Sequence, residues 1–172
     1  MKNTTAIVLG TAFVAVAGCT SSGAYGGGNK TLAATQLYSG SQCATRGADT
    51  KAVWVTSAQR LDQYYDQIHG GKLGIQPEPL PEIDFDKEGV LMIEMGRRSS
   101  GGYGVSVGQK GAYLVGGDAV VHVDWAEPAE GTMQTQALTA PCVMVKLRYA
   151  GYGRIRVVDQ NEQERLTVPV PK

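Results

Sequence analysis

The stretch YGVSVGQKGAYLVGGDAVVHVDW, residues 103–125, decides the fold. Apolar and polar residues alternate along most of it, and turn signals interrupt it at Lys110-Gly111 and Gly116-Gly117-Asp118. Alternation with a period of two places every second side chain on the same face of a sheet. The strands predicted here are Tyr103–Gln109, Ala112–Val115 and Ala119–Trp125.

Similar short apolar runs flank this stretch, and Gly, Pro or polar residues typical of turns separate them. One of these turns is predicted at 159–163. Further strands are predicted at Lys51–Thr56, Gly89–Met95, Met133–Leu138, Val143–Tyr149, Arg154–Val158 and Arg165–Val168. Many short strands separated by turns are typical of an antiparallel architecture, because antiparallel neighbours need only tight connections.

One segment, residues 58–69, follows a helical pattern instead. Its apolar residues are Leu61, Tyr64, Tyr65 and Ile68, at the spacing i, i+3, i+4, i+7. Ser57 can cap the first turn, and Gly70-Gly71 ends the pattern. The predicted fold class is therefore mainly β, or α+β: an antiparallel β-sandwich or roll with one packed amphipathic helix.

Composition narrows the functional classes. The chain has 172 residues, of which 42% are hydrophobic, and 16 Lys+Arg balance 16 Asp+Glu. This size and apolar content suit one folded domain and argue against disorder. Nucleic-acid binding needs clustered cations, which the sequence lacks, so no nucleic acid is expected as a partner. With two His and three Cys, no metal and no cofactor are expected either.

The N-terminus indicates export. Lys2 precedes an uncharged run at 6–16, and small residues follow before Cys19, which is the pattern of a secretory signal peptide over residues 1–18. The sequence Val16-Ala17-Gly18-Cys19 resembles the bacterial lipobox, in which the Cys is lipidated and begins the mature protein. We therefore predict lipidation at Cys19; the alternative is an ordinary signal peptide with an unmodified Cys.

A flexible connection is expected after the lipidated residue. Residues 19–31 are rich in Gly and Ser, without an apolar period, and so predict a flexible tether. The domain is then expected over residues 32–172. Thr20 stands where Asp would indicate inner-membrane retention, so we predict a lipoprotein anchored to the outer membrane and facing the periplasm.

Two cysteines remain for the domain, Cys43 and Cys142. In an oxidising compartment an even pair favours a disulfide over a metal site. Two separate buried thiols are the alternative, because sequence alone does not show that the two Cα atoms approach.

One loop between predicted strands has the composition of a contact surface. Residues 97–103 are Arg97, Arg98, Ser99, Ser100, Gly101, Gly102 and Tyr103. Arg and Tyr are favoured at protein interfaces, and Gly allows close approach of the backbone to a partner. The sequence predicts a partner-binding loop here; the alternative is a hairpin connection with polar decoration.

Catalysis is not expected from this sequence. It lacks the nucleophile elbow, zinc-protease, phosphate-loop and dinucleotide motifs. His69 and His122 are interpreted as structural. The acidic pairs, Asp84 with Asp86 and Asp118 with Asp124, are more typical of solvated strand edges than of acid–base catalysis. We expect no catalytic residue and no small-molecule substrate.

Residues 84–147 resemble the C-terminal domain of the PrcB family, which are protease complex subunit-like proteins. The similarity is carried by the run DFDKEGVLMIEMG at 84–96, by Ser100-Gly-Gly-Tyr103, by Glu127-Pro128 and by QALTAPCVMVK at 136–146. The family usually has Pro-Thr at the positions of Ser99-Ser100. The placement of Cys43 and Cys142 also resembles that in proteobacterial members, which favours the disulfide.

The resemblance implies a non-catalytic partner that stabilises or assists an envelope protease. Two alternatives differ in class. The Ser-Gly-Gly-Tyr loop is distantly similar to a loop of chagasin-type inhibitors of cysteine proteases, and a structural envelope lipoprotein without a protease partner is the other. If the loop binds the partner, Gly101→Arg should abolish binding and leave the thermal transition nearly unchanged.

Overall fold

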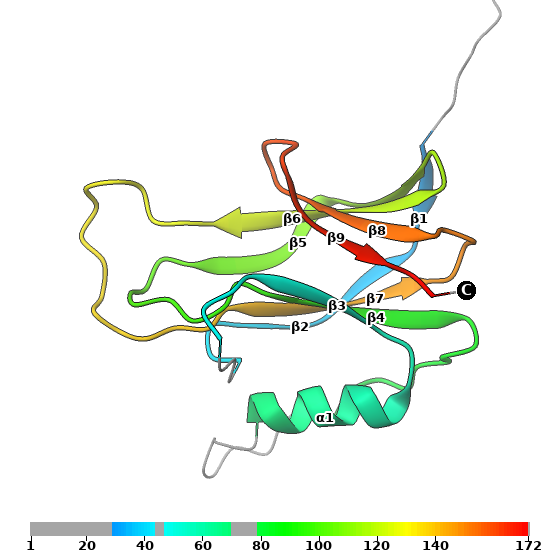
Figure 1. Ribbon diagram of the computed structural model, residues 1–172, viewed down its shortest axis with the longest axis horizontal. Helices are drawn as coiled ribbons and strands as arrows, with labels where there is room; N and C mark the ends of the chain where they lie inside the picture. The colour runs from blue at the N-terminus through cyan, green and yellow to red at the C-terminus, as the bar shows by residue number, and fades with distance from the viewer. Residues whose placement is uncertain (1–28, 44–46, 70–78, 172) are drawn as a thin grey trace, which may run out of the picture.

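Two β-sheets pack face to face, and a single helix covers the outer face of one of them (Figure 1). The computed structural model describes residues 29–43, 47–69 and 79–171. Its elements are β1 (Lys30–Leu32), β2 (Ala34–Gly40), β3 (Lys51–Val55), α1 (Ala58–His69), β4 (Glu88–Glu94), β5 (Gly104–Val115), β6 (Asp118–Ala126), β7 (Cys142–Arg148), β8 (Arg154–Val158) and β9 (Glu164–Pro169). The predicted sandwich with one helix is confirmed.

Strand order shows how the two sheets are built. The five-stranded sheet has the order β1-β5-β6-β8-β9 and the four-stranded sheet the order β2-β7-β4-β3. All pairs are antiparallel except β6 and β8, which run parallel. The chain passes from one sheet to the other between β1 and β2, so a single extended segment lies at the edge of both.

The core lies between the sheets and follows from the period of two. Leu91 and Ile93 of β4 and Met95, directly after it, belong to the cluster between the sheets, whereas Val90 and Met92 of β4 belong to the cluster under α1. All five side chains are buried. β4 is therefore covered on both faces, which explains why its sequence is almost continuously apolar rather than alternating.

The helix confirms its predicted pattern. α1 packs on the outer face of the four-stranded sheet, with Leu61 and Ile68 buried against it. The backbone N–H of Leu61 donates to the carbonyl of Ser57 at 3.1 Å. This bond closes the first turn of the helix at the residue predicted to cap it.

Three of the predicted strands differ from the structure. Tyr103–Gln109 and Ala112–Val115 are one long strand, β5, because β6 pairs with both halves and absorbs Lys110-Gly111 as a register shift. Gly111 has a φ of 65° at this irregularity. Met133–Leu138 is not a strand but part of the connection between β6 and β7. Thr and Gln alternate along it with the period of two that is typical of a strand. No strand among the described residues pairs with it, so it does not form one.

The N-terminal predictions lie mostly outside the described residues. Those are the signal peptide over 1–18, the lipidated Cys19 and the tether up to residue 28. Lys30 and Thr31, which the sequence assigned to the tether, are the first residues of β1 and pair with Leu114 and Tyr113. Within the described ranges, no helix is long and apolar enough to cross a membrane.

Candidate functional site

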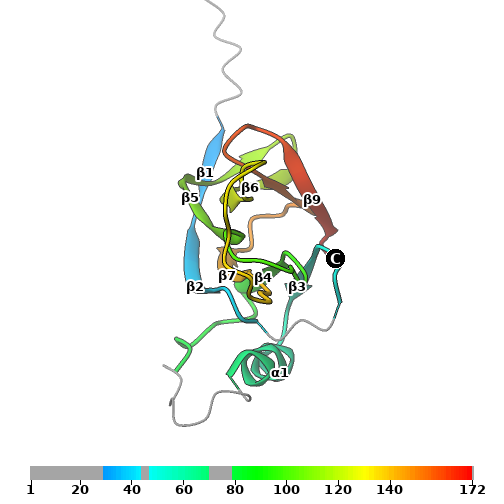
Figure 2. The ribbon, with the colours of Figure 1, turned by 90° about the vertical axis from the view of Figure 1, so that its left-hand side faces the viewer.

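The loop Arg97–Tyr103 connects β4 to β5 at one end of the sandwich, on the left of Figure 1. It shares this end with the β6–β7 connection, residues 127–141, which crosses from the five-stranded to the four-stranded sheet (Figure 2). We call these two segments together the two-loop surface. The two segments lie close together because the strands that flank them are neighbours: β4 pairs with β7, and β5 pairs with β6.

Backbone hydrogen bonds hold the two segments together. The N–H of Arg98 donates to the carbonyl of Thr139 at 2.8 Å, and the N–H of Thr139 donates back at 2.9 Å. The N–H of Gly101 donates to the carbonyl of Thr135 at 2.9 Å. The hydroxyl of Thr139 donates to the carbonyl of Ser100 at 2.9 Å. The predicted loop is therefore braced along its length.

Not every side chain of the loop is available to a partner. The Arg98 guanidinium donates from Nη2 to the hydroxyl of Thr50 at 2.9 Å and lies 5.5 Å from the centre of the Tyr103 ring. Thr50 in turn donates to the carbonyl of Met95 at 3.1 Å. Arg98 and Tyr103 are half-buried and fix the loop, whereas Arg97 and Ser99 are exposed.

The glycines of this loop have distinct structural roles. Gly102 has a φ of 86°, a conformation that L side chains rarely adopt. Gly101 has an ordinary φ, but a Cβ at this position would lie 2.3 Å from the Thr135 hydroxyl oxygen. Gly101→Arg therefore displaces the Thr135 hydroxyl besides adding a large cation. The expectation that this variant tests the surface alone is revised: Arg97 and Ser99 are the better positions.

Two exposed apolar side chains of the surface were missed by sequence reasoning. Met133 is 100% exposed and Leu138 is 62% exposed, and the third large apolar residue that is exposed among the described residues is Val115, at 37%. Both residues lie in the predicted strand Met133–Leu138. Side chains alternate between the two faces of a strand, so that prediction would bury one of the two. Gly131, with a φ of 77°, precedes Met133 and was the available signal for a turn.

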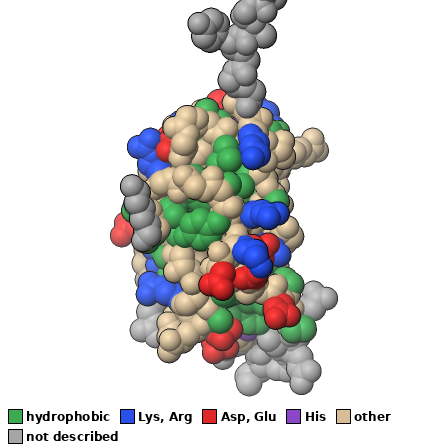
Figure 3. All heavy atoms as spheres, turned by 90° about the vertical axis from the view of Figure 1, so that its right-hand side faces the viewer, with side chains coloured by type: hydrophobic (Ala, Val, Ile, Leu, Met, Phe, Trp, Pro, Cys, Tyr) green, Lys and Arg blue, Asp and Glu red, His purple; other side chains and the backbone are tan. Residues whose placement is uncertain are grey.

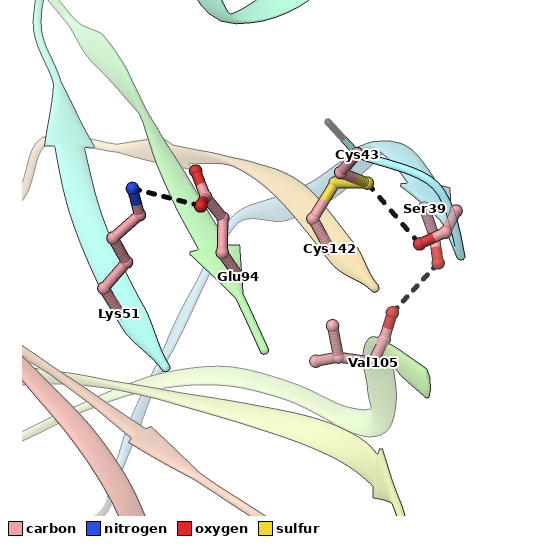
Figure 4. The surroundings of a disulfide bond; sticks show 7 residues. Ser39, Cys43, Lys51, Glu94, Val105 and Cys142 are labelled. Carbon is pink, nitrogen blue, oxygen red and sulfur yellow. Dashed lines mark hydrogen bonds and ion pairs between the residues drawn. A yellow bond between two sulfur atoms is a disulfide. The ribbon is translucent and has the colours of Figure 1, made fainter. Parts of the chain in front are cut away.

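A disulfide fixes the base of the β6–β7 connection. Cys43 and Cys142 are bonded, with their Cα atoms 5.9 Å apart (Figure 4). The predicted pairing is thus present, and the alternative of two separate thiols does not apply. Around it the Cys43 N–H donates to the Ala140 carbonyl at 2.9 Å, and the Gln42 side chain donates to the Leu138 carbonyl at 2.8 Å.

Figure 4 also shows two contacts near the disulfide, one between the two sheets and one within the four-stranded sheet. The hydroxyl of Ser39 on β2 donates to the carbonyl of Val105 on β5 at 2.9 Å. The buried carboxylate of Glu94 on β4 is paired with Lys51 on β3, at 3.2 Å between Oε2 and Nζ. The Lys51–Glu94 pair holds the C-terminal end of β4, after which the Arg97–Tyr103 loop begins.

The β8–β9 turn and the start of β9 hold the end of β6, just before the β6–β7 connection. The Gln160 side chain bonds both the N–H and the carbonyl of Trp125, at 2.9 and 3.0 Å. The Arg165 guanidinium lies 5.4 Å from the centre of a Trp125 ring and also binds the buried carboxylate of Asp159 at 2.8 Å. Burial alone would raise the pKa of Asp159, but bonds from the Gln163 N–H, Arg165 and the Asn161 N–H together lower it.

The other residues that the sequence singled out do not meet at a site. Asp84 pairs with Lys87, whose hydrogen bond lowers the pKa of that carboxyl, and Asp118 pairs with Arg154 at 2.7 Å. His122 contacts the Tyr113 ring edge-on, with ring centres 6.0 Å apart. Among residues 29–43, 47–69 and 79–171, no cluster of three His, Cys, Asp or Glu side chains could hold a metal ion.

The opposite end of the sandwich differs in character. It carries the β5–β6 and β7–β8 turns, and acidic and basic side chains are interspersed there (Figure 3). One of its cations is paired with a carboxylate, in the Arg154–Asp118 ion pair. This end has the features of an ordinary solvated surface.

Comparison with known proteins gives one family. Residues 90–148, about a third of the chain, match the family described as PrcB C-terminal. No curated protein and no solved structure matches. The matched range begins within β4, includes both segments of the two-loop surface and ends with β7. The resemblance to the PrcB family, noted for residues 84–147, is thereby confirmed from residue 90 onward: residues 90–148 are similar to the PrcB C-terminal domain.

Proposed function

We propose that this chain is a non-catalytic, lipid-anchored envelope protein that binds another envelope protein, a component of a protease complex, through the Arg97–Tyr103 loop. The family match supports an association with a protease complex. The observation that carries the choice of surface is the bracing of this loop by backbone bonds to Thr135 and Thr139, with Arg97 and Ser99 left exposed.

Bracing matters because binding must offset the entropy of ordering an interface. A loop that is already fixed loses less conformational freedom when a partner docks. The half-buried pair of Arg98 and Tyr103 maintains the loop shape from beneath. The arrangement therefore suits recognition by a preformed surface rather than by a segment that folds on binding.

The location of the surface is also compatible with a membrane tether. Lys30 pairs with Leu114 near the far end of β5, whereas Gly104 begins β5 at the two-loop surface. The 12 residues of β5 span roughly 35 Å at the usual rise per strand residue. A chain anchored through Cys19 would therefore present this surface away from its point of attachment.

In-cell photocrosslinking tests the proposal. The full-length lipoprotein is made with a photoreactive phenylalanine analogue at Ser99, or at the exposed Gln109 of β5 as the matched control. We expect an adduct with a protease or protease-associated protein from Ser99 and none from Gln109. Adducts identical at both positions, or only with abundant outer-membrane proteins, would contradict the proposal.

Assays of the captured protease then distinguish a stabilising subunit from an inhibitor. A stabilising subunit lengthens the lifetime of its protease and leaves turnover unchanged, whereas an inhibitor lowers turnover at a stoichiometric dose. We favour the stabiliser, because the resemblance to the PrcB family, which residues 90–148 match, implies a protein that assists a protease.

A further inference from the structure

The β6–β7 connection carries an apolar feature that the Arg97–Tyr103 loop lacks. Met133 is completely exposed and Leu138 is exposed to 62%. The other three methionines of the described residues, Met92, Met95 and Met144, are exposed by at most 1%. A long apolar side chain held wholly in solvent contributes nothing to the core of this domain, and its burial by a partner would be favourable.

The backbone around these two side chains is held in place. The Thr132 hydroxyl donates to the carbonyl of Ala129 at 2.7 Å, and the Gln134 side chain donates to the Thr132 hydroxyl at 2.9 Å. On the other side, the Thr135 carbonyl accepts the Gly101 bond, and the Leu138 carbonyl accepts the Gln42 bond. The scaffold thus supports Met133 and Leu138 on both sides.

Charge flanks this apolar feature asymmetrically. Arg97 and Glu130 are both exposed, and among the described residues neither has an ion pair or a side-chain hydrogen bond. Glu130 precedes Met133 on the connection, whereas Arg97 adjoins the Arg98–Thr139 bridge next to Leu138. An exposed anion therefore lies on the same segment as the two apolar side chains, and an exposed cation lies on the neighbouring segment, next to the bridge residue Arg98.

We propose that Met133 and Leu138 are the apolar anchors of the docking surface. They enter an apolar pocket on a partner protein that presents a carboxylate toward Arg97 and a cation toward Glu130. This inference rests on the proposed function and names the chemistry of the partner surface. In protein interfaces a few fully buried anchor side chains, surrounded by nearly neutral contacts that exclude water, supply most of the binding energy.

A lipid surface is the other apolar environment that these side chains could meet. Two apolar residues without a surrounding group of cations give little attraction to an anionic membrane. The described chain also begins at the opposite end of β5, beside Leu114. We therefore assign the anchors to a protein, and lipid contact becomes an outcome of the test.

The test keeps the photoreactive group at Ser99 of the full-length lipoprotein and changes a second residue. Met133→Asp should lower the yield of the Ser99 adduct at least tenfold, because it places a charge in the apolar pocket. Met133→Leu should retain the adduct, since it keeps an apolar side chain of similar volume. Val115→Asp, a change at the exposed apolar residue of the far end, is the matched control and should have no effect.

A chemical version of the same test uses hydrogen peroxide. Peroxide transfers one oxygen atom to the Met133 thioether, giving the polar sulfoxide and water. Among the described methionines Met133 alone is accessible to it. Oxidised wild-type protein should lose the adduct, whereas the oxidised Met133→Leu variant should keep it.

The outcomes separate the two proposals. An adduct that persists with Met133→Asp overturns the anchor assignment and leaves the Ser99 loop as the binding surface. Absence of any Ser99 adduct in the wild type overturns both proposals. A photoreactive group at position 133 that crosslinks only to lipid overturns the protein assignment.

Discussion

Replacing both Cys43 and Cys142 by Ala should lower the free energy of unfolding by roughly 3–5 kcal/mol, since the disulfide closes a loop across 99 residues. The crosslink restricts the unfolded chain, and a loop of this length gives a large entropic effect in that description. Both residues are buried in the cluster under α1, so the removed sulfurs also leave a packing defect. Urea denaturation followed by tryptophan fluorescence measures the change.

The position of this disulfide gives the prediction a second readout. Because it holds the segment that bonds Ala140 and Leu138, its loss should increase amide exchange in the β6–β7 connection more than in β5. The matched control is the wild type under a reductant, which should approach the stability of the double variant. A double variant as stable as the oxidised wild type would contradict this account.

Gly89→Ala should be the most destabilising small substitution in the sheet, at about 3 kcal/mol. A Cβ at Gly89 would lie 2.3 Å from Cζ2 of Trp54, whose ring lies across β4 at this position. The ring has little room to retreat, because it contacts Tyr149 and Tyr152 edge-on and donates from Nε1 to the Tyr149 hydroxyl at 3.1 Å. Forcing atoms into such a core costs ~1–3 kcal/mol or more.

A matched control and a double variant make this prediction sharp. Gly153→Ala adds the same methyl group where no atom lies within 4 Å, and it should change stability by less than ~0.5 kcal/mol. If the Trp54 ring is the obstacle, Gly89→Ala should cost little in a Trp54→Leu background. Additive effects of the two substitutions would show that the clash is not the cause.

The elements with strong periodicity were predictable from the sequence. α1 and the strands β3, β4 and β6–β9 follow local patterns that the tertiary structure reinforces. β1 and β2 were missed, because their sequence is mostly polar and their strand form depends on pairing with β5 and β7. The split of β5 was wrong for the same reason. Lys110-Gly111 is a turn signal locally, and only the pairing of both halves with β6 makes it an irregularity within one strand.

The candidate site was predictable only in part. A partner-binding role of the Arg97–Tyr103 loop was predicted from its composition, because Arg and Tyr are favoured at protein interfaces. Its partner segment was not, since the bonds from Gly101 to Thr135 and from Arg98 to Thr139 join residues far apart in sequence. Met133 is exposed because this segment is not a strand, and Gly131 was the local signal for that.

The most direct measurement of the central claim is amide exchange in the complex. The protein crosslinked through Ser99 is purified and added in excess to the full-length chain, and exchange is followed by mass spectrometry. We predict protection across residues 97–103 and 127–139, with no change in the β5–β6 turn at 116–117. Protection confined to that turn, or to α1, would show that the partner binds elsewhere and would contradict the account.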